Sequence, residues 1–430
     1  MERQITPHLV IRNGRVLDPA NNFDEIADVE VQNGQIVKIG KDLNIQLKPN
    51  EEFDATGCLV TPGLIDFHAH VYQYATPLGV NPDETCLARG VTTVVDAGSA
   101  GASTLPGLRK YIMEKNKTRV LCFVHVASHG LSAAGCAGVV KGGECDSLNQ
   151  VDPELCAKCI QENRDVAVGV KVRLSCSVTN NGQFEEEAYR RALRASAAAG
   201  VPLMVHFTHS SISVNESPDP GQLTCPGSLK KGDILTHVFH AHPSSIINPS
   251  TQKIHSSIHQ ARRRGVLFDI GHGFGSFSWT VAEICAKEQF WPDIISTDLH
   301  TKSLNGPTYD LPMVMSKLLT IGMPLVDIIR AVTITPASAI GWQSKIGSLS
   351  PGLVADVTVL RVEDVDMEIE DSQGQVRQAE KLLIPIAVWR DGNHFIVRKP
   401  DPIPGKNTSR LIENWDCLII KDYKKPKPLE

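Results

Sequence analysis

The sequence predicts an α/β fold in which a (β/α)8 TIM barrel is joined to a small β-sandwich domain. Three observations predict this fold. The chain is 430 residues long, its middle alternates apolar runs of strand length with helix-like stretches, and both of its ends resemble short strands separated by turns. A length of two to three ordinary domains favours one large domain with a smaller one beside it.

Eight apolar runs are the expected barrel strands. They are too apolar for strands with one face in water, and helix-like stretches such as EEEAYRRALRASAAAG lie between them. The strands of a closed parallel barrel are buried on both faces, and eight units in about 280 residues match the usual size of such a barrel. A doubly wound sheet is the alternative, but the chain lacks its Gly-rich phosphate turn. The runs lie at 64–70, 91–98, 119–127, 166–174, 201–207, 233–239, 265–271 and 293–299.

The two ends of the chain share a residue pattern that differs from that of the middle. Asn-Gly pairs at 13–14 and 33–34 separate alternating segments, which is a hairpin pattern, and ADVTVL and KLLIPIAVWRDG near the other end again resemble strands. We therefore expect residues 1–60 and 346–430 to form one composite β-sandwich domain beside a barrel of residues 61–345.

Composition limits the partners that the chain can have. The formal net charge of -5 provides no basic surface for nucleic acid or an acidic membrane, so we expect a small-molecule substrate. The N-terminus lacks the apolar region of a secretory signal and no apolar run has the length of a membrane span, which predicts a cytoplasmic protein. The 11 cysteines are an odd number within mostly apolar runs, so we expect reduced core thiols. A homo-oligomer remains open.

The first expected strand ends in a His-x-His pair. The active site of a barrel lies at the C-terminal ends of its strands, and side chains alternate along a strand, so His68 and His70 should point together into the barrel. The pair alone is a weak motif, because a buried histidine that bonds a backbone carbonyl is more common. Its weight comes from polar residues at the ends of four other strands.

Lys171 interrupts the apolar run VAVGVKVRL. An ammonium group inside a barrel wall is costly unless it is paired or neutralised. One interpretation pairs Lys171 with a carboxylate such as Asp298. The other is a lysine that has taken up carbon dioxide as a carbamate, an oxygen ligand able to bridge two metals, and sequence spacing leaves both open.

His206, His237 and Asp298 end three further runs. Each histidine alone is as consistent with a core position as with a ligand, but together with His68 and His70 they indicate a metal site. Imidazole and carboxylate ligands suit zinc, manganese or iron, with zinc the usual ion for hydrolysis. Asp298 is expected to act both as a ligand and as a general base.

With these residues in place, the chain resembles the amidohydrolase superfamily over nearly its whole length. The resemblance rests on TPGLIDFHAH, the strand-four lysine, the later histidines and aspartate, and the β segments at both ends. Three finer stretches, VVDAGSAGASTLPGLR, DIGHGFGSFSW and STDLHTKSLNGPTYDLPMVMSKLL, resemble its deacetylase branch, whose members are often labelled dihydroorotase-like.

The resemblance implies two divalent ions, with zinc the default, bridged by a carbamylated Lys171. It implies that His68, His70 and Asp298 hold the first ion. The second ion is then held by His206 and His237. A hydroxide shared by the ions would attack the scissile carbonyl, and Asp298 would pass its proton to the leaving group.

Five further residues are candidates for catalysis or substrate contact. Arg173 lies two residues after Lys171 on the same strand face, where its guanidinium could bind a substrate carboxylate or simply pair with a protein acid. His272, between two glycines after the seventh strand, could hold the carbonyl oxygen or the substrate acid, or could be a turn residue. Ser99, Gly101 and Asn305 lie in loops and could contact the substrate.

The function expected is hydrolysis of an acyl group, most simply acetyl, from an amide or ester of a small carboxylate-bearing compound. The nearest alternative is a cyclic-amide hydrolase of the dihydroorotase or hydantoinase kind on the same metals. A non-catalytic scaffold is the alternative from another class, and the presence of all six expected ligand types argues against it.

Overall fold

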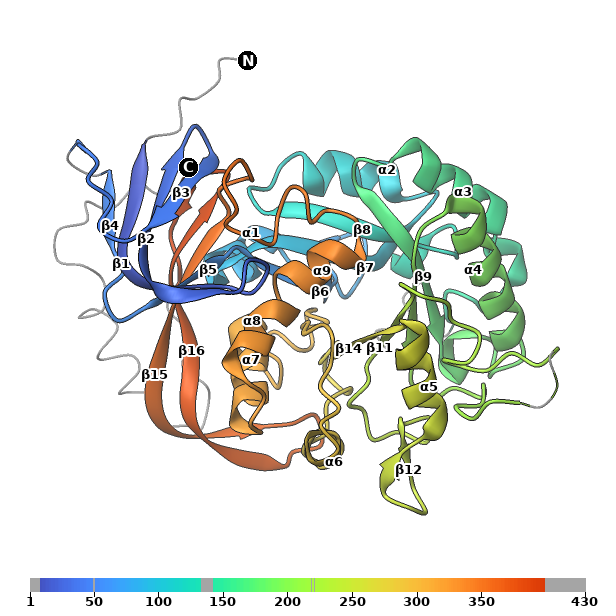
Figure 1. Ribbon diagram of the computed structural model, residues 1–430. Helices are drawn as coiled ribbons and strands as arrows, with labels where there is room; N and C mark the ends of the chain where they lie inside the picture. The colour runs from blue at the N-terminus through green and yellow to red at the C-terminus, as the bar shows by residue number, and fades with distance from the viewer. Residues whose placement is uncertain (1–7, 49–50, 133–141, 218, 220, 399–430) are drawn as a thin grey trace.

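The computed structural model describes residues 8–48, 51–132, 142–217, 219 and 221–398. They form a parallel barrel with a mixed sheet beside it (Figure 1). The strands are β1 Leu9–Asp18, β2 Phe23–Gln32, β3 Gln35–Gly40, β4 Glu52–Asp54, β5 Leu59–Pro62, β6 Leu64–Ala69, β7 Val91–Gly101, β8 Arg119–His125, β9 Ala167–Leu174, β10 Leu203–Phe207, β11 Ile234–Thr236, β12 Ile247–Asn248, β13 Lys253–Ile254, β14 Leu267–Asp269, β15 Val357–Glu370, β16 Val376–Arg390 and β17 Asn393–Phe395. The helices are α1 Pro82–Thr85, α2 Leu105–Leu108, α3 Pro153–Glu162, α4 Glu185–Ala199, α5 Ser256–Arg264, α6 Trp279–Lys287, α7 Leu311–Thr320, α8 Leu325–Ala331 and α9 Ile334–Ala339.

The barrel is confirmed, and its strands pair in parallel in the order β6, β7, β8, β9, β10, β11 and β14. The eighth expected run contributes single parallel bridges in place of a full strand. Ile294 pairs with Asp269 of β14 and Leu299 pairs with Ala69 of β6, so this run closes the ring.

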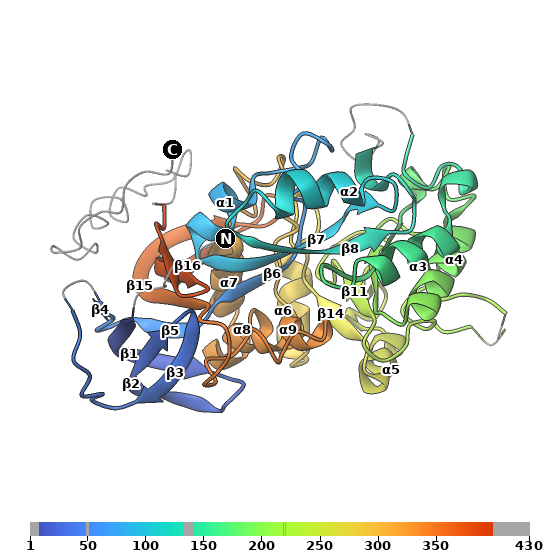
Figure 2. The ribbon, with the colours of Figure 1, turned by 90° about the horizontal axis from the view of Figure 1, so that it is seen from above.

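Two apolar layers explain why the barrel strands are so hydrophobic. Side chains such as Phe67, Phe123 and Met204 belong to a core cluster lined by strand residues, and all three are fully buried. On the other face, residues such as Val170 pack in a larger core with Tyr189 of α4. Figure 2 shows α3 and α4 along the outside of the strands. Both faces of each strand are therefore buried, as a closed parallel barrel requires.

Helix ends follow local sequence signals. Asp152 accepts a hydrogen bond from the backbone N–H of Leu155 at the start of α3, and Asp310 accepts one from Met313 at the start of α7. Both helices have proline in their first turn, where its missing N–H has no partner to lose. Gly200 ends α4 with φ +65°, a conformation that glycine adopts without strain.

The β domain joins both ends of the chain, as expected, but as one continuous sheet. Its order is β17, β16, β15, β5, β1, β2 and β3, with β4 also paired to β1. β5 pairs parallel with β1 and antiparallel with β15, and this double pairing joins the two chain ends. The strands enclose their own core, in which the rings of Phe53 and Trp389 pack edge to face with their centroids 5.0 Å apart. The domain limits at 60/61 and 345/346 stay a prediction.

The long hairpin of β15 and β16 continues beyond the sheet and along the barrel helices (Figure 1). The N–H of Leu383 donates to Ser316 Oγ of α7 at 2.9 Å. Near the hairpin tip, Asp371 Oδ2 accepts from the N–H of Trp279 at 3.0 Å and Ser372 N–H donates to the carbonyl of Phe277 at 3.0 Å. We call this hairpin the arm, because it holds α6 and α7 from outside.

Within the described part of the chain, no helix combines the length and the apolar character that crossing a membrane requires. The nine cysteines among these residues are free thiols, and all but Cys176 are buried. This fits the expectation of core thiols.

Candidate metal centre

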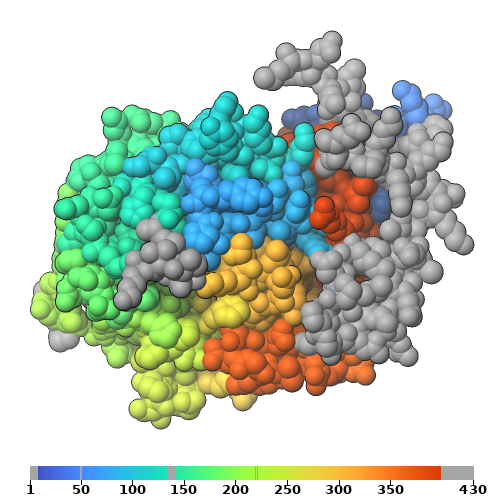
Figure 3. All heavy atoms as spheres, turned by 180° about the vertical axis from the view of Figure 1, so that it is seen from behind, coloured from blue at the N-terminus to red at the C-terminus, as the bar shows by residue number. Residues whose placement is uncertain are grey.

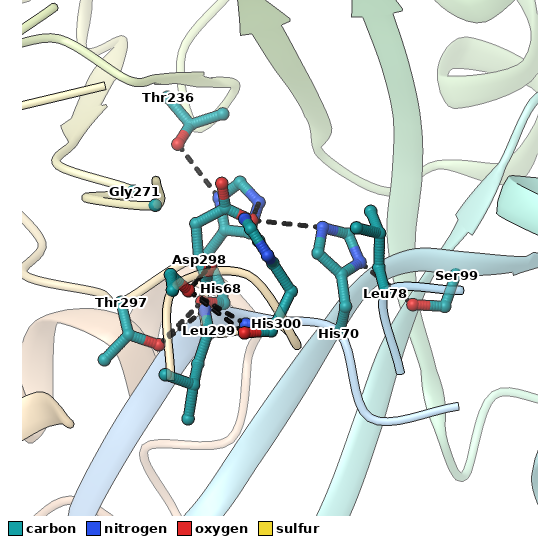
Figure 4. A network of polar contacts seen from close by, with 12 residues as sticks. His68, His70, Leu78, Ser99, Thr236, Gly271, Thr297, Asp298, Leu299 and His300 are labelled. Atoms are coloured by element: carbon teal, nitrogen blue, oxygen red, sulfur yellow. Dashed lines mark hydrogen bonds and ion pairs between the residues drawn. The ribbon is translucent and has the colours of Figure 1, made fainter. Parts of the chain in front are cut away.

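The His-x-His pair and Asp298 meet at the mouth of the barrel (Figure 4). Asp298 Oδ1 lies 3.3 Å from His68 Nε2 and 3.1 Å from His70 Nε2. The ligand atoms of the three residues lie within 4.8 Å of one another. The first and eighth strands therefore bring two imidazoles and one carboxylate to one point, as the sequence predicted.

Barrel closure sets this geometry. The N–H of Asp298 donates to the carbonyl of His68 at 2.6 Å, and the N–H of His70 donates to the carbonyl of Leu299 at 2.9 Å. Asp298 adopts φ +46°, a left-handed conformation that is unusual for a residue other than glycine. Figure 3 shows the face opposite that of Figure 1, where the segment after His70 lies against the loop after residue 300, and Thr301 N–H donates to Leu78 O at 3.0 Å.

Hydrogen bonds to the far side of each ring orient the two imidazoles. His68 Nδ1 lies 3.0 Å from Thr236 Oγ1, whose hydroxyl donates to Asp269 Oδ2 at 2.6 Å. His70 Nδ1 lies 2.9 Å from Ser99 Oγ. Because a ring that donates through Nδ1 has its lone pair on Nε2, both Nε2 atoms can face a cation as ligands.

His237 and His206 extend the cluster. The His237 ring centroid lies 5.1 Å from that of His68 and 4.3 Å from that of His206. His237 Nδ1 donates to the carbonyl of Gly271 at 2.7 Å, and its Nε2 is buried with no hydrogen-bond partner among the described residues. His206 Nε2 lies 2.8 Å from Thr208 Oγ1, so Nδ1 is the ring nitrogen that a cation could use.

Lys171 lies at the base of the same cluster. Its side chain is almost fully buried, and Nζ lies 3.3 Å from His68 Nε2 and 3.4 Å from Met204 Sδ. Burial lowers the pKa of Lys171 to about 7. Among the residues described, no carboxylate lies within 4.0 Å of Nζ, so the ion pair with Asp298 considered from the sequence is not formed.

The charge states of the cluster suit cation binding. Burial lowers the pKa of His206 and His237 well below the usual value, so both rings are neutral near pH 7, the form in which imidazole binds metal. Burial opposes charge on Asp298, but the neighbouring His68 and His70 lower its pKa well below the usual range. The Asp298 carboxylate in turn raises the pKa of His68 above its ordinary value, although burial of that ring opposes the charge.

These donors fit a divalent metal centre. Four imidazoles, one carboxylate and a lysine amine converge. The His237 Nε2 lone pair is buried with no hydrogen-bond partner in the described part of the chain, which is costly unless a cation uses it. Nitrogen and carboxylate oxygen ligands are those of zinc and similar transition metals.

The residues predicted to contact substrate lie in different settings. Arg173 is mostly buried beside Glu144, with its Nη1 3.2 Å from Glu144 Oε1. Ser99 is held against His70, as described above, and Asn305 is exposed in the loop after the eighth strand. At Gly101, a Cβ would collide with the backbone of residues 127 and 128, so this glycine permits close packing of two strand ends.

The His272 ring faces protein partners through both of its nitrogens. Lys317 Nζ lies 2.8 Å from Nε2, and Nδ1 lies 2.9 Å from the carbonyl of Gly273 and 3.0 Å from Thr308 Oγ1. The ring is fully buried and stacks on Phe277 with centroids 4.6 Å apart. Both ring nitrogens thus contact protein groups, an arrangement closer to the turn-residue alternative than to the substrate-facing one, and the role of His272 stays a prediction.

Several buried polar residues around the cluster escaped the sequence analysis. Asp269 accepts from Thr236 and Ser296 through different oxygens, each at 2.6 Å, and Asp66 accepts from Thr297 Oγ1 at 2.6 Å. Asp66 and Asp269 each interrupt an apolar strand, LIDFHAH and GVLFDIG, which is the signal that could have identified them. Glu144 lies in a loop and not in an apolar strand, so no interruption of an apolar run could have identified it.

Comparison with known proteins identifies related chains. The amidohydrolase family matches residues 59–393. A deacetylase of Brucella anthropi is 34% identical over 383 residues, which cover 89% of this chain and 91% of the relative. A crystal structure of an adenine deaminase has TM-score 0.81 at 30% identity, covering 90% of this chain and 99% of that one. A dihydroorotase structure has TM-score 0.80 at 30% identity, with coverage of 92% and 99%.

Proposed function

Because this chain belongs to the amidohydrolase family, we propose that it is a metal-dependent hydrolase that removes an acyl group, most simply acetyl, from an amide or ester of a small carboxylate-bearing compound. The observation that carries the proposal is the convergence of His68, His70 and Asp298 with Lys171 and the buried lone pair of His237. A relative of nearly equal length that is named deacetylase supports the acyl substrate.

Two divalent ions, with zinc as the first choice, are the proposed cofactor. His68, His70 and Asp298 would hold one ion, while His206 and His237 would hold the other. When bound, such a pair lowers the pKa of an attacking water and polarises the scissile carbonyl.

Carbamylated Lys171 is the proposed shared ligand. A neutral lysine amine forms a C–N bond with carbon dioxide and loses one proton, which gives a carbamate with two oxygen donors. The reaction requires the amine and not the ammonium, and burial already lowers the pKa of Lys171 to about 7. Burial of Lys171 beside His68 and Met204 therefore favours the amine that this modification requires.

Asp298 is the proposed proton carrier, and Arg173 is the proposed substrate-binding residue. Asp298 is a carboxylate next to two imidazole Nε2 atoms, where it can take a proton from the attacking water and return it to the leaving nitrogen or oxygen. Arg173 is paired in register with His206 across the β9–β10 ladder, which supports its guanidinium as the group that would bind the substrate's carboxylate.

A cyclic-amide hydrolase is the second candidate. The specific observation in its favour is the dihydroorotase structure that matches 92% of this chain at 30% identity. The same ligands serve both reactions, so only the substrate separates the two functions.

One experiment tests both candidates. Purified protein supplied with zinc and bicarbonate is assayed against acetylated amino acids and acetylated hydroxy acids of both chiralities, and against dihydroorotate. We expect release of acetate and no turnover of dihydroorotate. Turnover of dihydroorotate alone would replace the first candidate by the second. Substoichiometric bound metal with no turnover at all would indicate a non-catalytic protein.

A further inference from the structure

A buried carboxylate outside the proposed ligand set lies at the barrel mouth. Glu144 is about 1% exposed, although it belongs to a loop and not to a strand. The loop is fixed to the segment after β9. Cys145 N–H donates to Val178 O at 3.0 Å, and the Asp146 carboxylate accepts from the N–H groups of Gly143 and Asn180, each at 2.6 Å.

Close packing makes this placement rigid. A Cβ at Gly143 would collide with the backbone and side chain of Val178, so only glycine lets the loop approach this closely. Glu144 is therefore presented to the barrel by backbone that is held on both sides. A side chain on such a support keeps a defined position.

Two cationic or donor side chains face the Glu144 carboxylate. Arg173 Nη1 lies 3.2 Å from Oε1 and 3.5 Å from Oε2, so both contacts use one nitrogen of the guanidinium. His125 accepts a hydrogen bond from the N–H of Ala127 on Nδ1, which places its proton on Nε2, 3.8 Å from Glu144 Oε1. Neither His125 Nε2 nor Glu144 Oε1 has a hydrogen-bond partner among the described residues.

We infer that Glu144 is a positioning residue that orients Arg173 to recognise the carboxylate of the substrate, so that the pair selects acidic substrates over their neutral analogues. This inference rests on the proposed acyl hydrolase function. A guanidinium offers five N–H donors in a fixed plane, and the contact of Glu144 with Nη1 restrains where that end of the guanidinium lies. Fixing it before substrate arrives removes part of the entropic cost of binding.

The position of Arg173 relative to the proposed ligands supports this role. Arg173 follows Lys171 by two residues on β9, which places their Cα atoms about 7 Å apart on one strand face. His125 pairs with Lys171 across the β8–β9 ladder. The three-residue group of Glu144, Arg173 and His125 thus borders the cluster on the side of β8 and β9.

The test compares an acid with its neutral analogue. Glu144→Gln keeps the shape of the side chain and removes its charge, and Glu144→Asp keeps the charge. The matched control is Glu186→Gln, which breaks an exposed Glu–Arg pair on α4. Each variant is assayed with the N-acetyl amino acid that wild type hydrolyses fastest and with the primary amide of that acid, and bound zinc is measured throughout.

For Glu144→Gln we expect KM for the acid to rise by about tenfold, because a displaced guanidinium misplaces the carboxylate. KM for the primary amide, kcat for both compounds and bound zinc should stay close to wild type. Glu144→Asp should recover part of the loss, and Glu186→Gln should behave as wild type. An equal change for acid and amide, or an unchanged KM for the acid, would overturn the inference.

A stability cycle separates this inference from the proposed function. Arg173→Met or Glu144→Gln alone leaves one member of a buried pair, and we expect each to lower Tm by about 3 °C or more. The double variant should lose less than the sum of the two single variants, whereas additive losses would overturn the pairing. If the wild-type protein is inactive towards every acylated acid, the proposed function is rejected. The stability cycle would still decide whether Glu144 and Arg173 are coupled.

Discussion

The two halves of the barrel are held in different ways. From β6 to β10 the strands have 6, 11, 7, 8 and 5 residues, and main-chain ladders join them. Beyond β10, β11 and β14 have three residues each and the eighth run makes only isolated bridges. We call these the regular half and the irregular half.

Side-chain hydrogen bonds add to the short main-chain ladders of the irregular half. Ser296 Oγ donates to Asp269 Oδ1 at 2.6 Å, and Thr297 Oγ1 donates to Asp66 Oδ2 at 2.6 Å. The irregular half also contains the two candidate ligands with left-handed backbone, His237 at φ +70° and Asp298 at φ +46°. At His237 the left-handed residue follows directly on the end of β11 at Thr236.

The largest expected effect comes from deleting the ligand at His237. His237→Asn should keep the fold, because Asn tolerates the left-handed backbone at this position better than most residues. Activity should fall by on the order of 100-fold or more, at least as much as when a group that supports a ligand is removed. Turnover, bound metal and circular dichroism measure these outcomes.

His259→Asn is the control for that variant, since this histidine is partly exposed on α5. Wild-type turnover by His237→Asn would show that the irregular half contributes no ligand there.

A matched pair of threonine variants tests how each half is held. Thr297 and Thr92 are both fully buried, but Thr297 Oγ1 donates to Asp66 and accepts from Leu299 N–H at 2.9 Å. Among the residues that the structure describes, Thr92 Oγ1 makes one hydrogen bond, to Leu64 O at 3.3 Å. Thr297→Val should therefore lower the free energy of unfolding by about 2 kcal/mol, and Thr92→Val by less than about 1 kcal/mol. Urea unfolding of the metal-free proteins measures both, and equal losses would remove the distinction between the halves.

The smallest expected effect is a pH dependence in the regular half, at Lys171. With its pKa lowered to about 7 by burial, the amine should react with carbon dioxide about tenfold more slowly at pH 6 than at pH 8, at equal dissolved carbon dioxide. The carbamate signal that appears after addition of ¹³C-labelled carbon dioxide follows the rate, with Lys171→Met as the blank. A rate that does not change with pH would mean that Lys171 is already neutral at pH 6.

The lowered pKa of Lys171 also makes the stability of the metal-free protein depend on pH. The folded state binds fewer protons than the unfolded chain between pH 7 and the ordinary lysine value of 10.5. The contribution of Lys171 to the stability of the metal-free protein should therefore rise with pH across that interval, and should be lost below it.

The sequence predicted the barrel and the convergence of six residues, because apolar periodicity and strand-end position are local signals. It did not predict the short eighth strand, since nothing in DIISTDL shows that its bonds come from Asp66 and Asp269 on other strands. It also missed the surroundings of His272. Lys317 is 45 positions away on α7, and only tertiary structure brings its ammonium to that ring. Polar pairs between distant elements leave no pattern in either segment.

The arm has a consequence for how this protein can be rearranged. Lys317 Nζ donates to the carbonyl of Glu370 at the end of β15 at 2.6 Å, as well as to the carbonyl of Pro307 at 2.7 Å. A barrel moved without the arm would lose this acceptor and the outer cover of α7. We therefore expect a chimaera of two relatives to fold best when the arm comes from the same parent as the barrel whose last helix, α9, it follows in the sequence.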